Sequence, residues 1–166
     1  MFSNERGFSL AETVIALGVL TTGVIGAAGV LVTGMNNLGS SPSDVISAQK
    51  ATQAIESVFA ARDSKRLAWS QITNVSNGGV FLDGAQPLYL AGADGFVNTA
   101  DDAAAGLETE ILPGQSIALT AYTRQIQISD VSGENGDLRM ITVTITYQNG
   151  QTHRSYVLIT YISAFS

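Results

Sequence analysis

Residues 13–35 decide the fold and read TVIALGVLTTGVIGAAGVLVTGM, a run without a charged side chain. As an α-helix the run would extend about 34 Å at ~1.5 Å per residue, and the hydrocarbon core of a bilayer is ~30 Å thick. Helices buried in soluble domains are usually shorter, so we expect this segment to span a membrane. The cation before it, Arg6, slightly favours a cytoplasmic N-terminus.

A cleaved secretory signal peptide is the main alternative for this run. Such peptides have an apolar region of about 7–15 residues followed by small residues at the cleavage site. Residues 26–29, Gly-Ala-Ala-Gly, resemble such a site, but the apolar run is longer than a signal peptide needs. We therefore expect the run to be retained.

The composition limits the classes of function. The chain has 166 residues, the size of one ordinary domain, and only 13% of them are charged, whereas soluble domains carry about 25%. This deficit suggests surface hidden in a membrane or an assembly. The net charge is −6 and the 8 Lys and Arg residues are scattered, so nothing indicates nucleic-acid binding. The absence of cysteine excludes disulfides, thiolate zinc sites and cysteine nucleophiles.

One acidic residue, Glu12, lies at the edge of the apolar run. A carboxylate deep in a bilayer costs on the order of 3 kcal/mol, and such residues usually have a partner and a function. Two other interpretations need no partner: Glu12 lies at the level of the headgroups, or it stabilises the helix N-terminus through the helix dipole. Position alone leaves the functional and the structural interpretations evenly matched.

The residues around Glu12 resemble the processing signature of type IV pilins and pseudopilins. Residues 6–12 read Arg-Gly-Phe-Ser-Leu-Ala-Glu and lead directly into the apolar helix. The resemblance implies that prepilin peptidase cuts between Gly7 and Phe8 and that Phe8 is N-methylated. It also implies that Glu12 pairs with the terminal amine of a neighbouring subunit.

Electrostatics supports the implied pairing. Inside an apolar helix bundle an unpaired amine or carboxylate is costly, so the pair would set the axial stagger of the subunits more than it would add net stability. Two positions depart mildly from the family pattern: Ser9, where Thr is common, and Ala11, where Ile or Leu is commoner.

Four small residues recur along the apolar run: Gly18, Thr22, Gly26 and Gly29. At 100° per residue they lie within about 80° of one another around a helix. Small side chains let helices approach closely in an apolar medium, so we expect this stripe to be a packing face. The alternative is that glycine is simply frequent in membrane helices.

The apolar helix is expected to break, or to kink, at residues 36–42. Gly39 suits a helix C-cap, Ser41 an N-cap and Pro42 the first position of a new helix. A continuous, kinked helix is an equal alternative.

An amphipathic helix is expected next, at residues 43–67. Its apolar side is predicted to consist of Val45, Ala48, Ala51, Thr52, Ile55, Val58 and Phe59. We expect this side to lie against a sheet. The cations near its end, Arg62, Lys65 and Arg66, are expected to offset the helix dipole rather than to bind phosphate.

Residues 70–115 are rich in glycine and read as a long loop with short strands near 80–82 and 88–90. Its acidic part offers oxygen atoms that suit calcium, from Asp94, Asn98, Asp101 and Asp102. The spacing does not match an EF-hand. The favoured alternative is a solvated turn with capping aspartates, so no cofactor is expected beyond this weak candidate.

The C-terminal third has the clearest strand pattern. Residues 138–148 alternate apolar and threonine side chains, and Asn149-Gly150 suits a two-residue hairpin turn. That turn places Val143 opposite Tyr156. Residues 117–129 are expected to form a third strand whose apolar side consists of Tyr122, Ile126 and Ile128.

These elements predict an α+β fold, in which one long or broken N-terminal helix packs on a C-terminal antiparallel sheet. The resemblance makes this a pilin fold, with a leader at 1–7, a membrane and filament-core helix at 8–38 and a globular domain at 39–166, its strands within 117–164. The ending Thr160-Tyr161-Ile162-Ser163 is similar to minor pilins of the PilV or GspI kind.

The resemblance also implies a function and partners. The chain would be a minor pilin held in the cytoplasmic (inner) membrane with its globular domain outside, and then part of a periplasmic or extracellular filament. Its partners would be other pilin subunits, prepilin peptidase and the inner-membrane assembly platform. The alternatives are a type II secretion pseudopilin, a membrane-anchored adhesin or binding domain that does not polymerise, and a membrane-tethered enzyme.

Nothing in the sequence indicates catalysis. The only histidine, His153, lies beside the hairpin turn, and no nucleophile elbow, phosphate-binding loop or metalloprotease motif occurs. Glu108 and Glu110 are expected in a loop, where no partner would shift their pKa values in a way that serves catalysis. We therefore expect no enzyme activity and no catalytic residue.

Overall fold

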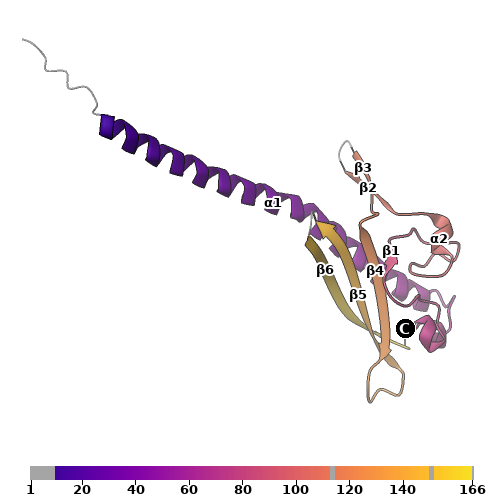
Figure 1. The fold of residues 1–166 in the computed structure, drawn as a ribbon. Helices are drawn as coiled ribbons and strands as arrows, with labels where there is room; N and C mark the ends of the chain where they lie inside the picture. Colours follow the sequence, from indigo (N-terminus) through magenta and orange to yellow (C-terminus); the bar gives the residue numbers. More distant parts are fainter. Residues whose placement is uncertain (1–9, 113–114, 150–151, 166) are drawn as a thin grey trace, which may run out of the picture. The chain divides into compact units, whose positions relative to one another are not determined.

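The computed structural model of the chain describes residues 10–112, 115–149 and 152–165. The chain divides into two compact units, Met1–Ser41 and Pro42–Ser166. The helices and strands, in chain order, are α1 (Leu10–Asp63), β1 (Gln86–Pro87), α2 (Asp102–Ala105), β2 (Thr109–Leu112), β3 (Gln115–Ala118), β4 (Tyr122–Asp130), β5 (Leu138–Asn149) and β6 (Thr152–Ser163) (Figure 1). The expected α+β class, with an apolar N-terminal helix and an antiparallel sheet, is confirmed.

Helix α1 is one element of 54 residues. Of the two alternatives for residues 36–42, the structure has the continuous helix, with Pro42 inside it. Proline removes one donor from the helical hydrogen-bond ladder, and the backbone on both sides stays helical. The helix ends at Asp63, before the expected residue 67, because Lys65 adopts a left-handed φ of 54°.

The part of α1 after Pro42 buries a face that only partly overlaps the predicted one. Of the predicted residues, Ala51 and Val58 are buried, and Ile55 and Phe59 pack against the core. The buried residues of this part are Ile46, Ser47, Lys50, Ala51, Ala54, Val58 and Ala61. Val45 and Thr52, expected on the buried side, are exposed. Two causes override apolarity here: small alanines let the neighbouring backbone approach closely, and Lys50 lies against two carboxylates that compensate its charge.

The main sheet is antiparallel, with the strand order β1-β4-β5-β6. One face is buried, and on β4 and β5 it consists of Tyr122, Arg124, Ile126, Ile128, Arg139, Ile141, Val143, Ile145 and Tyr147. Its apolar members form a single core with the buried apolar residues of α1 and with Phe81 and Leu88 from the connecting segment. The predicted apolar side of β4 is therefore confirmed, but the pattern did not identify Arg124 as part of it.

The β5–β6 hairpin is present, but its register differs from the prediction by two residues. Val143 pairs with Leu158 rather than with Tyr156, and Asn149 pairs with Thr152. Because side chains alternate with a period of two, this shift leaves every side chain on its predicted face. The two residues between the strands, 150 and 151, are outside the described residues.

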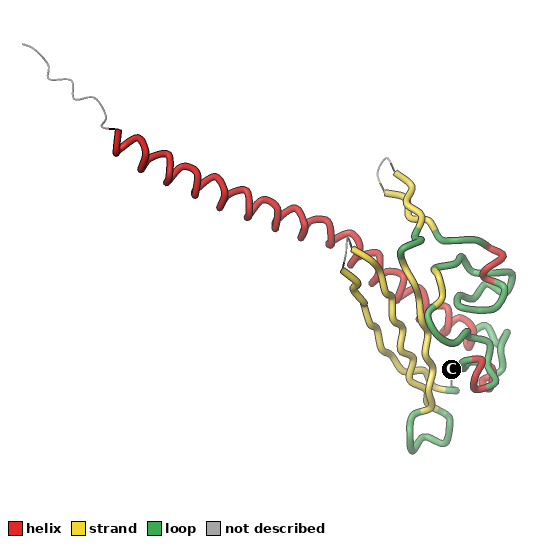
Figure 2. Tube along the Cα trace, viewed as in Figure 1, coloured by secondary structure: helices red, strands yellow, loops and turns green. Residues whose placement is uncertain are grey.

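Figure 2 shows that most of the chain between α1 and β2 is loop, as expected. The strands predicted near 80–82 and 88–90 are only isolated bridges at Phe81 and Tyr89, and the short strand β1 lies between them. The expected strand at 117–129 is divided: β3 pairs with β2 in a separate two-stranded sheet, and β4 begins at Tyr122.

Asn74 holds this loop against β4. Its amide nitrogen donates to the carbonyl oxygen of Ile126 at 2.8 Å, and its amide oxygen accepts from the backbone N–H of Ile128 at 2.8 Å. One buried side chain thus satisfies two backbone groups that a neighbouring strand would otherwise pair. No periodic pattern reveals such a residue, so the sequence did not identify it.

Candidate functional site

The first candidate site is the start of α1. Gly7 and Phe8, where the resemblance places cleavage and methylation, are outside the described residues. Glu12 is exposed and lies in the first turn of the helix, where the helix dipole favours a carboxylate. The structure therefore places Glu12 where the alternative interpretation also requires it.

Helix α1 from Leu10 to Leu31 is long and apolar enough to cross a membrane, and none of its most apolar window is buried. Its exposed large side chains are Leu10, Val14, Ile15, Leu17, Val19, Leu20, Val24, Ile25, Val30 and Leu31. A signal sequence near an N-terminus has the same length and composition. Such a surface needs an apolar environment, and a bilayer and a bundle of equivalent helices both supply one.

The small-residue stripe, defined as Gly18, Thr22, Gly26 and Gly29, is open in the described structure. A methyl group added to any of its three glycines would meet nothing within 4 Å. The hydroxyl of Thr22 donates to the carbonyl oxygens of Gly18 at 3.1 Å and Val19 at 2.9 Å. The stripe therefore needs no water to satisfy its hydroxyl and could enter an apolar contact.

The globular unit contains a buried ionic cluster, defined as Lys50, Glu108, Glu110, Arg124 and Asp102. Lys50 Nζ lies 2.8 Å from Glu108 and 3.4 Å from Glu110, and Arg124 Nη1 donates to Glu108 at 3.1 Å. Asp102 lies 3.9 Å from Arg124. Burial lowers the pKa of Arg124, while Glu108 and Asp102 act in the opposite direction.

This cluster corrects one expectation. Glu108 and Glu110 were expected in a loop without partners, yet Glu108 is buried between two cations and Glu110 lies at the second residue of β2. The sequence hid the cluster because its members are separated by up to 74 positions, from Lys50 to Arg124. Such a closed arrangement joins the second part of α1 to β4, and it presents no open acid–base pair to a substrate.

The structure brings together three of the four calcium candidates. Ligand oxygens of Asp94, Asp101 and Asp102 lie within 4.8 Å of one another. The fourth candidate, Asn98, directs its amide nitrogen to the carbonyl oxygen of Leu82 at 3.0 Å.

Hydrogen bonds explain these carboxylates as parts of a turn. Asp102 accepts from the backbone N–H groups of Gly92, Asn98 and Thr99, all of which precede it in the chain. Bonds from the N–H of Asp94 and the hydroxyl of Thr99 lower the pKa of Asp101. This differs from the favoured alternative, a solvated turn with capping aspartates, because Asp102 is buried and Asp101, at the N-cap of α2, makes no side-chain capping bond. Calcium binding stays a prediction.

Tyr147 and Asp44 form a contact that the sequence did not reveal. The Tyr147 hydroxyl donates to the carboxylate of Asp44, on α1, and Arg154 of β6 lies 3.9 Å from the same carboxylate. Tyr122 stacks on Tyr147, with ring centres 5.5 Å apart. Burial, together with the bond to Asp44, raises the pKa of Tyr147. The contact joins α1 to both long strands of the hairpin.

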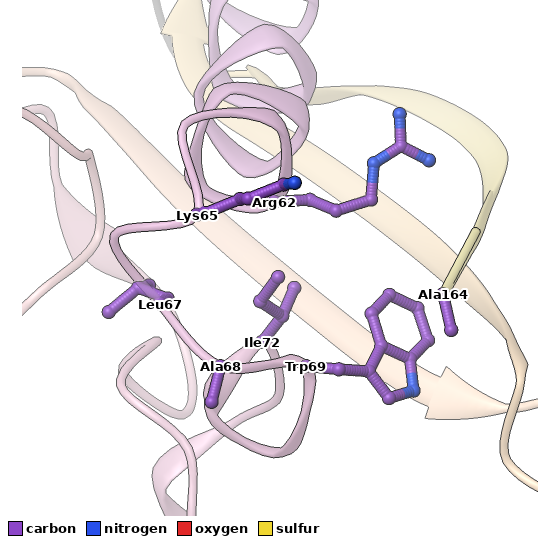
Figure 3. A pocket seen from close by; sticks show the side chains of 7 residues that line it. All are labelled: Arg62, Lys65, Leu67, Ala68, Trp69, Ile72 and Ala164. Carbon is purple, nitrogen blue, oxygen red and sulfur yellow. The ribbon is translucent and has the colours of Figure 1, made fainter. Parts of the chain in front are cut away.

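A pocket of about 360 Å³ lies beside the end of α1 (Figure 3). It is lined by Arg62, Lys65, Leu67, Ala68, Trp69, Ile72 and Ala164. Arg62 is already engaged, since it donates to the carbonyl oxygen of Ser163 at 3.1 Å and pairs with Asp63 at 2.7 Å. Arg66, outside the pocket, lies over the ring of Phe96. Of the three cations expected to offset the helix dipole, only Arg62 lies in the last turn of α1, and Lys65 and Arg66 follow the end of the helix.

Comparisons with models of protein families, with curated proteins and with solved structures find no match for this chain.

Proposed function

We propose that this chain is a structural subunit of a type IV pilus or a related filament, with the character of a minor pilin. One observation carries the proposal. Helix α1 from Leu10 to Leu31 has an apolar surface that nothing in the described structure covers, and its first turn contains the acidic residue Glu12. The pair Gly7-Phe8 precedes the helix in the sequence. A membrane holds such a helix in the monomer, and equivalent helices cover it in a filament.

The proposed sequence of events begins with hydrolysis of the Gly7–Phe8 peptide bond by prepilin peptidase. Hydrolysis adds one water molecule and leaves a free amine on Phe8. The amine nitrogen then takes a methyl group from a sulfonium methyl donor and loses one proton, while the donor leaves as a thioether. The Glu12 carboxylate of an incoming subunit pairs with the amine of its neighbour, because either charge would be costly if left alone among apolar helices. The small-residue stripe lets the helices approach closely enough for that pair to form.

The globular unit is the compact unit that the filament would carry. Among the residues that the structure describes, its core and its buried ionic cluster consist of residues after Pro42. The proposed pilin fold agrees with this arrangement, in which the same long helix supplies the assembly surface and one wall of the domain. The proposed location is the inner membrane before assembly, with the globular unit outside, and a filament afterwards.

Mass spectrometry of the mature N-terminus tests the first step. The proposal expects a chain that begins at methylated Phe8. An intact Met1, or cleavage near Gly29, would exclude a pilin-type subunit and favour a membrane-anchored domain or a secreted protein.

Glu12→Ala tests assembly itself. We expect the variant to insert in the membrane at the wild-type level and to be depleted from sheared filaments, with Glu12→Asp as the matched variant that keeps the charge. Normal incorporation of Glu12→Ala would remove the assigned role of Glu12. Scoring pilus-dependent motility, DNA uptake and protein secretion after gene deletion separates a pilus subunit from a secretion pseudopilin.

A further inference from the structure

Strand β6 forms an edge of the main sheet along its whole length. The strand order ends with β6, and its pairing with β5 runs without interruption from Ser163 to Thr152. Edge strands are usually protected by shortness, by proline, by charge or by a bulge, because their free backbone groups pair readily with another chain. Residues 155–163 read SYVLITYIS and contain neither a proline nor a charge.

The outward side of this strand is apolar. Val157, Ile159 and Tyr161 are 50–55% exposed in the described structure. Their partners on β5 are Thr144, Thr142 and Met140, in that order. An apolar stripe confined to an open edge is typical of a surface that another strand covers.

The opposite edge of the sheet cannot serve the same purpose. Strand β1 is two residues long and ends in Pro87, which has no backbone N–H to donate. Pairing of β6 with β1 of a second copy could therefore form almost no ladder. The strands of the second sheet, β2 and β3, are four residues long each. Among identical chains β6 against β6 therefore offers the longest ladder in the described structure, and it closes on itself as a two-fold pair.

The strand is complementary to itself in this arrangement. Read from both ends about Ile159, the segment places Ser155 opposite Ser163 and Val157 opposite Tyr161. Apolar and hydroxyl side chains thus meet, and no charge faces a like charge. The nearest cation, Arg154, falls opposite the uncharged Ala164.

We propose that β6 pairs antiparallel with β6 of a second copy of this chain, about a two-fold axis at Ile159. The nine residues 155–163 on each side are fewer than the ~20–30 per partner of a stable interface. The pair is therefore reversible, and it forms between chains that a membrane concentrates. It does not depend on the filament function proposed above.

Cysteine crosslinking of the full-length chain in native membranes tests the pairing. The chain has no cysteine, so an introduced thiol is the only one in this protein. Two-fold pairing places the Cα atoms of residue 159 in the two copies about 4.5–5.5 Å apart, within the ~4.4–6.8 Å range of disulfides. Ile159→Cys should give a dimer that reductant reverses.

Two further variants define the register. Val157→Cys and Tyr161→Cys should crosslink poorly when each is alone, and well when the two are expressed together. Leu90→Cys, similarly exposed but outside the sheet, controls for random collision. Equal crosslinking from Leu90→Cys and Ile159→Cys, or exclusive linkage of Ile159→Cys to a different protein, would overturn the proposal.

A combined variant separates this pairing from filament assembly. Ile159→Cys with Glu12→Ala should still give the dimer, even when no filament forms. If the crosslink vanishes in that background, the contact is a product of filament assembly and the independent pairing is wrong. Ile159→Lys should abolish the dimers that energy transfer between labelled chains detects. The monomer should stay folded, because residue 159 is exposed. Unchanged energy transfer in this variant would also overturn the proposed pairing.

Discussion

Replacing Glu108 with alanine tests whether the buried ionic cluster holds α1 against β4. Glu108 neutralises two cations: Lys50 at 2.8 Å and Arg124 at 3.1 Å. The side chains of Glu108 and Arg124 are 3% and 1% exposed, so water cannot replace the lost carboxylate without opening the core. Removing one partner of a buried ion pair typically costs about 3–5 kcal/mol, and we expect Glu108→Ala to fall in that range.

The single tryptophan provides the assay. Trp69 lies beneath Arg139, whose guanidinium carbon is 4.4 Å from the ring centre, and its indole N–H donates to Gly136. Unfolding of the globular unit separates these groups and should change the emission of Trp69. Urea titrations of the full chain in detergent micelles then report the free energy of unfolding for wild type and variant.

Glu110→Ala is the matched control. Glu110 contacts the same lysine at 3.4 Å, but its side chain is 23% exposed and Lys50 keeps Glu108 as a partner. We expect a loss of about 0–1 kcal/mol, as for a partly solvated pair. A Glu108→Ala variant that unfolds at the same urea concentration as Glu110→Ala would refute the reasoning, since it would mean that the cluster contributes no more than a surface contact.

Three other perturbations follow from the structure. Asn74→Ala should lower the free energy of unfolding of the globular unit by about 1–3 kcal/mol in the same titration, because it leaves two buried backbone groups of β4 without a partner. A loss below about 0.5 kcal/mol would show that water replaces the amide. Tyr147→Phe should cost about 1 kcal/mol by removing the bond to Asp44. The pKa of Tyr147 is raised in the folded state, so its contribution is complete below the unfolded value near 10 and is lost as the pH rises through the folded value. Titrations across alkaline pH should show this loss in the wild type and not in the variant. Gly26→Ile should leave the monomer folded, since a methyl group added at this glycine would meet nothing within 4 Å, but it should lower incorporation into filaments. Gly23 is equally open and lies off the small-residue stripe, so Gly23→Ile should be incorporated normally. Equal incorporation of both variants would contradict a packing role for the stripe.

The failures of sequence interpretation in the globular unit share one cause. Lys50 was not included in the predicted buried side of its helix, and Glu108 was expected in a loop, because each was judged by its neighbours in the chain. Burial of a charge is decided by a partner that arrives from a distant segment. Val45 was assigned to the core for the same reason, and the helix instead turns its alanines inward.

The candidate sites divide in the same way. Glu12 and the small-residue stripe could be named from sequence, because a charge at the edge of an uncharged run is a local signal. Asp94, Asp101 and Asp102 could be grouped because they are close in the chain, but only the structure showed that backbone N–H groups already occupy their oxygens. The exposed edge of β6 could be recognised only from the strand order of the sheet, which the sequence of one strand does not contain.

By itself the sequence determined the apolar helix, the α+β class, the β5–β6 hairpin and the buried faces of β4, β5 and β6, because apolar side chains recur in consecutive residues with periods of 3.6 in a helix and of two in a strand. The tertiary structure alone decided the hairpin register, the buried face of α1 after Pro42, the ionic cluster around Arg124 and the open edge at β6. These features depend on which distant groups come into contact. The free energy of burying a side chain depends on those partners as well as on the side chain itself.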